Sequence, residues 1–532
     1  GPALAEGFRE TSERYGLLLD TVEFGLVHRI PYTRMLPVGA KNGPGEKPPP
    51  KLIMQLMLRL HPALRRRRKS AEEAERTKLW LEDLRRWDEE VKPATIARSL
   101  ELLRVETEAL SDGELVTHLG ECADWLYRMI KQHHEFNGAA LSGTARLLVS
   151  VTRWTGLTVT EILPLLAGAS PVSSGWVPEG ETLADAIAGD PEAQAKLASN
   201  EEAASLVDWL RSREGAVGEA ARAYLAIVGY RVVSGYDIGD RYALETPKLV
   251  VEGMRRAASR APWVDEKRLR ADTESIRARI PAEHLIEFHE LLAEARETYH
   301  LRDERGLYSD LWAAGIARRA ILGAGKRVAT AGRIHDAEHL IEASLDEMRA
   351  LILGQGGPSS DALAERFRFR RETKNTDAPA HLGPPIGPPP PLDWMPKGAA
   401  RRAMEALELT MASIFTEPSG QAPQIDGVVA RGSSAFGGVF EGRARLILGP
   451  DDFDRIEEGD VLITTSTSPA FNIVLPLVGG IVTDHGGVLS HAAIVAREFG
   501  IPAVVACGNA TTTIPDGAKV RIDGDAGEVT VL

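Results

Sequence analysis

The chain has 532 residues, more than one ordinary domain holds, which predicts several domains. Hydrophobic residues make up 43% and charged residues 26%, a globular composition that argues against general disorder. The net charge of −13 disfavours a nucleic-acid binder, which needs a basic face for phosphates. Two cysteines fit a reducing, cytoplasmic setting, and the lack of a run of about eighteen apolar residues predicts no membrane span or membrane partner.

Helical patterns dominate the chain before about residue 416. Apolar residues there recur at spacings of three and four within long stretches rich in Ala, Leu, Glu and Arg. The clearest stretches are Ala71–Trp87, Glu101–Leu110, Gly113–His133 and Leu285–Glu304. We therefore expect a large, mostly α-helical substrate domain over residues 1–376.

A Pro-rich stretch and a change of period mark the second domain. Asp377–Pro396 should be an extended, semi-rigid connector, and Gly398–Phe415 a bridging helix, so that residues 377–423 form a linker. After Ile425 the chain turns to short β-type runs separated by Gly, Asp and Pro, with one strong helix at His491–Phe499. The fold class expected is therefore multidomain, the helical domain being followed by a compact α/β domain over residues 424–532.

The stretch from Gly479 to Val505 carries the chemistry. Its pattern predicts a strand, a tight turn at Gly486-Gly487 and a helix in which Ser490 caps the start and His491 lies in the first turn. A helix start offers unpaired N–H groups and the positive end of the helix dipole, which would stabilise a phosphoryl group carried by the imidazole. Histidine is also neutral near pH 7 and a competent nucleophile. A histidine in isolation would more simply be part of a cap.

The whole string resembles the phosphohistidine swivelling domain of the phosphoenolpyruvate-utilising enzymes. In that family a Gly-Gly, two spacer residues, Ser/Thr-His-Ala-Ala, a following Ala-Arg-Glu and Gly-Ile-Pro-Ala-Val mark the phosphorylated histidine. The matching residues here are Gly486, Gly487, Ser490, His491, Ala492, Ala493, Ala496, Arg497, Glu498, Gly500, Ile501, Pro502, Ala503 and Val504. The resemblance implies that His491 carries a phosphoryl group.

The helical part resembles, more weakly, the acceptor-binding domain of the rifampicin phosphotransferases. In that group an Arg-Glu-x-x-Lys run faces the transferring phosphoryl group, and here the run ends in a histidine: Arg296-Glu297-Thr298-Tyr299-His300. The resemblance implies that Arg296 stabilises charge and that His300 or Glu297 accepts a proton. On one helix Arg296 and His300 would share a face. A surface ion pair is the alternative explanation for Arg296 and Glu297.

An acceptor pocket and a metal site are less clearly indicated. Trp154 and Tyr236 could line a pocket, although aromatic residues at helical spacings are more often core. The neighbouring His133 and His134 suggest a metal, but adjacent side chains on a helix point about 100° apart, and we expect no metal site.

The dikinases of this family phosphorylate the histidine with ATP bound on an ATP-grasp domain. The sequence before residue 416 contains no recognisable phosphate-binding loop. The domain order resembles rifampicin phosphotransferase without that module, and the large subunit of phenylphosphate synthase. We therefore expect ATP and Mg on a separate ATP-grasp partner subunit and no cofactor on this chain. The expected acceptor is a small-molecule hydroxyl, first a phenol or hydroxyacetophenone-like compound. Alternatives are a rifamycin-type antibiotic, or a phosphocarrier or regulatory scaffold without its own acceptor.

Overall fold

In this computed structural model the described residues are 1–27, 30–39, 50–233, 237–259, 265–373, 379, 382–383, 390–416, 427–468, 471 and 474–532. Contacts divide the chain into two compact units. Unit 1 holds residues 1–139, 237–239 and 305–405, and unit 2 holds residues 140–236, 240–304 and 406–532. None of the helices within the described residues is both long enough and apolar enough to cross a membrane.

Unit 1 is built mainly of helices. Its helices are α1 Pro2–Tyr15, α2 Lys51–Leu60, α3 Pro62–Thr77, α4 Leu79–Arg86, α5 Lys92–Leu103, α6 Asp112–Glu135, α17 Asp310–Thr330, α18 Leu345–Leu353 and α19 Ser360–Glu372. The long helix α17 packs against α6 and is buried around most of its circumference, with Trp312 fully covered. Ser111 and Glu114 form a capping box at the start of α6: the Ser111 hydroxyl accepts from the Glu114 N–H, and the Glu114 carboxylate accepts from the Ser111 N–H.

A β-hairpin interrupts the helical pattern of unit 1. Strands β1 Leu19–Val27 and β2 Ile30–Pro37 pair antiparallel, within the region where the sequence predicts only helices. The alternation of Val22, Phe24 and Leu26 with polar or small residues has the period of a strand, which accounts for the difference.

Unit 2 combines helices with the α/β domain. Its helices are α8 Val159–Ile162, α9 Pro178–Ala188, α10 Pro191–Ala198, α11 Ala203–Ser212, α12 Ala216–Val228, α13 Pro247–Ser259, α14 Glu266–Arg277, α15 Leu285–Thr298, α21 His491–Phe499 and α22 Ala510–Thr513. Three further helices contain a boundary between the units: α7 Asn137–Thr155, α16 Leu301–Tyr308 and α20 Ala399–Ile414.

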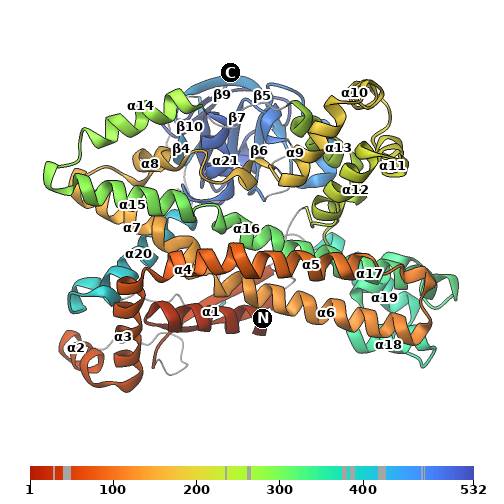
Figure 1. Cartoon of the computed structure of the whole chain (residues 1–532), viewed down its shortest axis with the longest axis horizontal. Coiled ribbons are helices and arrows are strands. Elements are labelled where there is room, and N and C mark those ends of the chain that lie inside the picture. Colours follow the sequence, from red (N-terminus) through yellow and green to blue (C-terminus); the bar gives the residue numbers. More distant parts are fainter. Residues whose placement is uncertain are drawn as a thin grey trace. The chain divides into compact units, whose positions relative to one another are not determined.

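The mixed sheet of unit 2 positions the histidine helix. Its strands are β3 Val428–Arg431, β4 Ser433–Phe436, β5 Val439–Leu446, β6 Val461–Thr464, β7 Gly480–Thr483, β8 Ala503–Val505, β9 Lys519–Asp523 and β10 Glu528–Val531. They lie in the order β3-β10-β9-β5-β6-β7-β8-β4, and β5 to β8 run parallel. The central strands β6 and β7 are buried on both faces, as parallel strands usually are. Helix α21 packs against β4, β7 and β8 (Figure 1).

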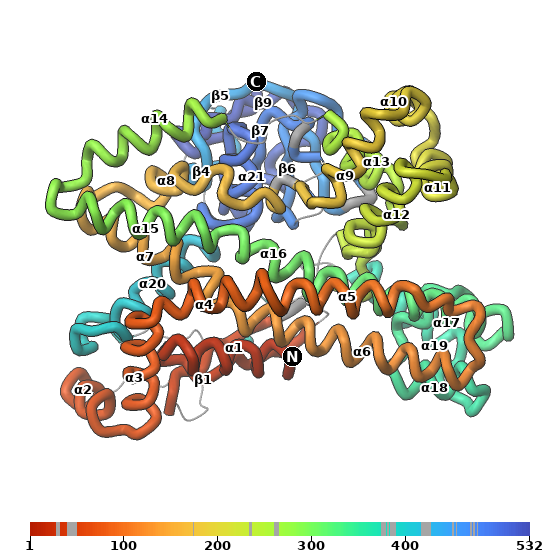
Figure 2. The backbone as a smooth tube through the Cα atoms, in the orientation of Figure 1, coloured from red at the N-terminus to blue at the C-terminus, as the bar shows by residue number. Residues whose placement is uncertain are grey.

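The predicted fold class is confirmed: a mostly helical region is joined to a compact α/β domain. The division of the chain differs in detail from the expected boundary at residue 376, because residues 140–304 group with the α/β domain through shared apolar clusters. Figure 2 shows the same path of the chain, with the α/β strands in blue. Half of the expected connector Asp377–Pro396 lies outside the described residues, whereas the expected bridging helix corresponds to α20.

Candidate functional site

Helix α21 begins at the predicted position. Ser490 is its N-cap residue, and the Ser490 hydroxyl accepts a hydrogen bond from the Ala493 N–H at 3.4 Å. His491 is therefore the first residue of the helix, where backbone N–H groups and the helix dipole favour an anion. Gly500 ends the helix in the left-handed conformation, with φ 68°.

The loop before His491 needs both of its glycines. Gly486 has φ 107°, a conformation that side chains rarely adopt. A Cβ atom at Gly487 would lie 2.2 Å from the Ser413 carbonyl oxygen, so only glycine fits there. The same oxygen accepts a hydrogen bond from the Leu489 N–H at 2.8 Å, and Leu489 is buried in an apolar cluster with α7, α14 and α15. The loop is thereby held against the helical part of unit 2.

The two ring nitrogens of His491 have different surroundings. Nδ1 lies 2.9 Å from the Thr467 hydroxyl oxygen, whereas Nε2 is buried and has no hydrogen-bond partner among the described residues. Burial lowers the pKa of His491 to about 4, the Asp303 carboxylate raises it and the Arg302 guanidinium lowers it further. The ring is therefore neutral at pH 7. If Nδ1–H donates to Thr467, Nε2 keeps its lone pair and is the nucleophilic atom.

Arg302 and Asp303 are the charged residues that act on His491, and both lie in the first turn of α16. The Arg302 guanidinium donates a hydrogen bond to the Leu489 carbonyl oxygen, just before the histidine. A cation and a carboxylate thus come from the helical part of unit 2 to the carrier position. Together they can stabilise a transferring phosphoryl group and accept a proton from a hydroxyl.

Two buried serines hold Asp303. The Ser173 hydroxyl donates to the Asp303 carboxylate and lies 2.6 Å from the Ser170 hydroxyl, so that Ser170 can donate to Ser173 in turn. Both serines are almost fully buried. Their chain of hydrogen bonds fixes the position of one oxygen of the carboxylate.

A second contact joins α21 to the helical part. The Glu498 carboxylate accepts a hydrogen bond from the Gly168 N–H at 2.8 Å. Burial raises the pKa of Glu498 to about 7, although this hydrogen bond and Arg497 act in the opposite direction. A pKa near 7 makes this contact sensitive to pH near neutrality.

The predicted residues of the helical part are placed differently from the expectation. Helix α15 ends at Thr298, so Arg296 and His300 do not share one helix face; the predicted continuous helix over 285–304 is wrong at this point. Arg296 donates to the carbonyl oxygens of Leu165 and Ala167 at 2.6 and 3.0 Å and so supports the loop that contains Gly168.

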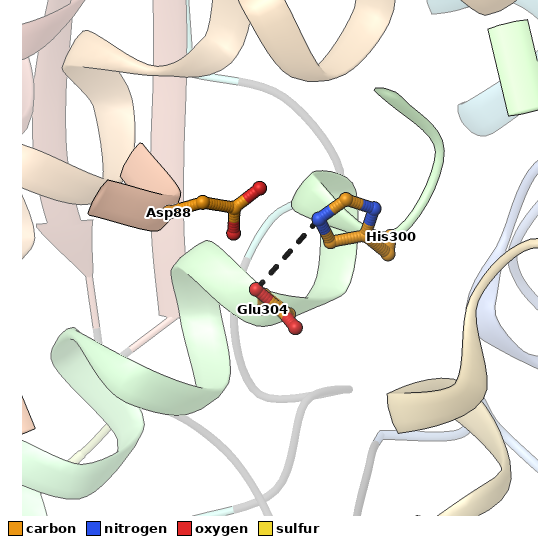
Figure 3. A group of neighbouring side chains, drawn as sticks. All are labelled: Asp88, His300 and Glu304. Carbon is orange, nitrogen blue, oxygen red and sulfur yellow. Dashed lines mark ion pairs between the residues drawn. The ribbon is translucent and has the colours of Figure 1, made fainter. Parts of the chain in front are cut away.

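Glu297 is exposed on α15. His300 lies in the turn before α16, and its Nε2 atom lies 4.0 Å from a Glu304 carboxylate oxygen (Figure 3). The distance to Glu304 does not test whether His300 accepts a proton, as the sequence resemblance implies.

The expected pocket residues are only partly described. Trp154 is half-buried, stacks on His284 with ring centroids 4.5 Å apart and packs against the apolar cluster of α7 and α15. This is the environment of a core aromatic residue. Tyr236 lies outside the described residues.

Sequence comparisons agree with the fold. Residues 456–527 match the mobile domain of the PEP-utilising enzymes, and residues 138–312 match the fourth domain of rifampicin phosphotransferase. The match of residues 456–527 to the mobile domain of the PEP-utilising enzymes confirms the resemblance recognised in the sequence.

Individual relatives share parts of the chain. Over 361 residues, 64% of the chain, it is 31% identical to chondramide synthase cmdD of Chondromyces crocatus, and over 58% of the chain it is 26% identical to the uncharacterized phosphotransferase YvkC of Bacillus subtilis. Over 18% of the chain it is 43% identical to the rifampicin phosphotransferase of Bacillus subtilis. The matched segments span 9%, 36% and 11% of these relatives, respectively.

Proposed function

We propose that the chain is the phosphohistidine-bearing part of an ATP-dependent phosphotransferase. ATP bound on a separate ATP-grasp subunit phosphorylates His491, and phospho-His491 then phosphorylates the hydroxyl of a small aromatic acceptor. The observation that carries the proposal is the state of His491. It is a neutral imidazole at a helix start, with Nδ1 against Thr467 and Nε2 buried without a partner among the described residues.

The charging half-reaction uses Nε2 as the nucleophile. Nε2 forms a bond to phosphorus as a phosphoanhydride bond of ATP breaks, and ATP with water yields AMP, inorganic phosphate and phospho-His491. Mg bound with ATP on the partner would neutralise the phosphate charge there. This chain contributes the His491 imidazole, whose lowered pKa keeps it unprotonated. It also contributes the N–H groups at the start of α21, which stabilise the charge of the bound phosphoryl group.

The discharge half-reaction uses the docked arrangement of unit 2. The acceptor oxygen forms a bond to phosphorus, the Nε2–P bond breaks, and the hydroxyl proton passes to the Asp303 carboxylate. Arg302 stabilises the charge on the transferring group. Ser173 and Ser170 keep the carboxylate oriented as a base. Splitting the transfer into two steps means that ATP and the acceptor need not meet.

A phenolic hydroxyl remains the first acceptor class. A phenol ionises more readily than an aliphatic alcohol and therefore gives up its proton more easily to a carboxylate base. The match of residues 138–312 to a domain of rifampicin phosphotransferase favours a rifamycin-type hydroxyl as the second candidate.

The proposal is tested by charging the chain with the ATP-grasp partner and ATP and weighing the intact protein. We expect one acid-labile phosphoryl adduct in the wild-type chain and none in His491→Ala. His485→Ala is the matched control, because this neighbouring histidine is exposed and should not carry phosphate. An adduct that persists in His491→Ala, or is lost in His485→Ala, would contradict the assignment.

A further inference from the structure

Helix α2 of unit 1 turns an apolar face outward. Leu52 is 80% exposed, Ile53 52%, Leu56 57% and Leu60 64%. Only Leu58 on this helix is fully buried, in a cluster that includes Leu18 and Met395. A contiguous row of exposed aliphatic side chains on one helix is unusual for a surface that faces only water, and marks an interaction site.

Basic residues border this apolar face. Residues 51–71 contain no Asp or Glu, in a chain whose net charge is −13. The cations of this stretch are Lys51, Arg59, Arg65, Arg66, Arg67, Arg68 and Lys69. The segment therefore has a charge opposite to that of the protein as a whole.

Some of these cations stabilise unit 1 and others do not. Arg67 is buried and lies 3.6 Å from Glu13 and 3.7 Å from Asp20, and Lys51 lies 3.7 Å from Asp393. Arg68 donates to the Leu58 carbonyl oxygen at 3.5 Å, which ties α3 to the end of α2.

Four exposed cations of this stretch stand apart from these contacts. Arg59, Arg65, Arg66 and Lys69 make no ion pair with a described residue. We call these four residues, together with Leu52, Ile53, Leu56 and Leu60, the α2–α3 surface.

We propose that the α2–α3 surface binds an anionic lipid bilayer. A helix that presents aliphatic residues beside arginines and lysines lies in the membrane interface, with its apolar side chains among the acyl chains and its cations at the lipid headgroups. The local positive charge allows a protein of net charge −13 to approach an anionic surface through this face. This binding departs from the expectation that no membrane is a partner, and it involves no membrane-spanning helix.

Two other occupants fit the same residues less well. In a symmetric dimer the same patch meets its copy, so Arg59, Arg65, Arg66 and Lys69 would face like charges. A protein partner would favour aromatic anchors, and the α2–α3 surface contains only aliphatic and basic side chains. Lipid headgroups and acyl chains match both parts of the surface at once.

Sedimentation with lipid vesicles tests this proposal on the full chain. We expect the protein to partition at least about tenfold more strongly onto vesicles of equal parts phosphatidylglycerol and phosphatidylcholine than onto phosphatidylcholine alone, and to be released by high salt. Leu52→Gln with Leu56→Gln, and separately Arg65→Gln with Arg66→Gln, should each abolish most of the binding.

Matched controls are Ile286→Gln, which changes an equally exposed aliphatic residue on α15, and Arg76→Gln, which changes a cation of α3 paired with Glu73. Both should bind like the wild-type chain, and unchanged melting temperatures would show that every variant folds. Equal partitioning of wild type and double variants, or no binding to anionic vesicles, would overturn the proposal. A dimer in light scattering that Leu52→Gln dissociates would also overturn it, in favour of a second copy.

Discussion

The chemistry of the site depends on how a few buried groups are protonated. A histidine that carries phosphate must be neutral when it attacks, and burial achieves this for His491 by lowering its pKa to about 4. Thr467 distinguishes the two ring nitrogens, since it binds Nδ1 and leaves Nε2 for the phosphoryl group. The sequence shows the histidine and its cap but not Thr467, because this contact joins residues 24 positions apart.

Glu498 provides a prediction on stability and pH. Its pKa is raised from 4.5 to about 7, so the folded state holds a proton that the unfolded state has released between these values. Raising the pH from 4.5 to 7 therefore removes stability. We expect the advantage of wild type over Glu498→Gln in unfolding free energy to fall by about 2 kcal/mol across this window.

Urea unfolding of both proteins at a series of pH values measures this difference. The titration of His491 has the opposite sign, because its folded pKa is depressed, but it is present in both proteins and cancels. A difference that stays constant, or grows with pH, would show that Glu498 is ionised throughout.

At the scale of elements, the short helices were predicted with unequal success. Ser490, His491 and the glycines around them define α21 locally, through a cap, a turn and an apolar repeat, and the structure confirms its start and its end. The helix predicted over 285–304 is interrupted after Thr298, because tertiary packing of Tyr299 and Leu301 outweighs a weak helical pattern. This break places Arg302 and Asp303, rather than Arg296 and His300, within electrostatic range of His491. No local pattern indicates such a long-range arrangement.

The first turn of α16 is therefore expected to govern discharge rather than charging. Asp303→Asn removes the proposed base and Arg302→Gln the proposed cation, and each should slow transfer from phospho-His491 to the acceptor by roughly a hundredfold. Formation of phospho-His491 should change little, because the partner supplies that chemistry. Single-turnover assays that start from the isolated phospho-protein separate the two steps.

Glu297→Gln is the control for these variants, since the exposed Glu297 side chain lies on the preceding helix. Discharge at the wild-type rate in both Arg302→Gln and Asp303→Asn would exclude the first turn of α16 as the acceptor site. Arg296 and His300 would then be the next residues to test.

At the scale of the molecule, unit 2 holds the carrier domain in the docked state, with Leu489 in a helical core and Nε2 covered. The proposed charging by ATP on another subunit would require this state to open, since Nε2 of His491 is buried in it. The sequence predicts the two domains and a connector between them. It does not predict how they dock, because their contacts are formed by residues hundreds of positions apart, such as Gly168 with Glu498.

A disulfide across the docked contact should block charging. The Thr160 hydroxyl on α8 donates to the Ser434 carbonyl oxygen on β4 at 3.4 Å, so Thr160→Cys with Ser434→Cys places one cysteine on each side of this contact. Under oxidising conditions we expect no phosphorylation by the partner and ATP, with recovery after reduction. Burial raises the pKa of both Cys122 and Cys507 to about 12, so these thiols should not interfere.

Each single-cysteine variant is the control and should be phosphorylated with or without oxidant. Mass spectrometry of the oxidised double variant would first verify the disulfide. If the cross-linked protein were phosphorylated at the full rate, His491 would be reached without opening of unit 2, and the requirement for opening would be wrong.

The most direct measurement of the central claim follows the phosphoryl group from His491 to an acceptor in the absence of ATP. The chain is charged chemically with phosphoramidate, freed of reagent and mixed with phenol, 4-hydroxyacetophenone or rifamycin, and the phosphorylated product is detected by mass spectrometry. His491→Ala, charged in the same way, corrects for phosphate on other histidines. The proposed function predicts an aryl or rifamycin phosphate with the wild-type chain and none with His491→Ala. The proposed function would be contradicted if wild-type phospho-His491 released only inorganic phosphate with each of the three acceptors. It would also be contradicted if His491→Ala formed as much product as the wild-type chain.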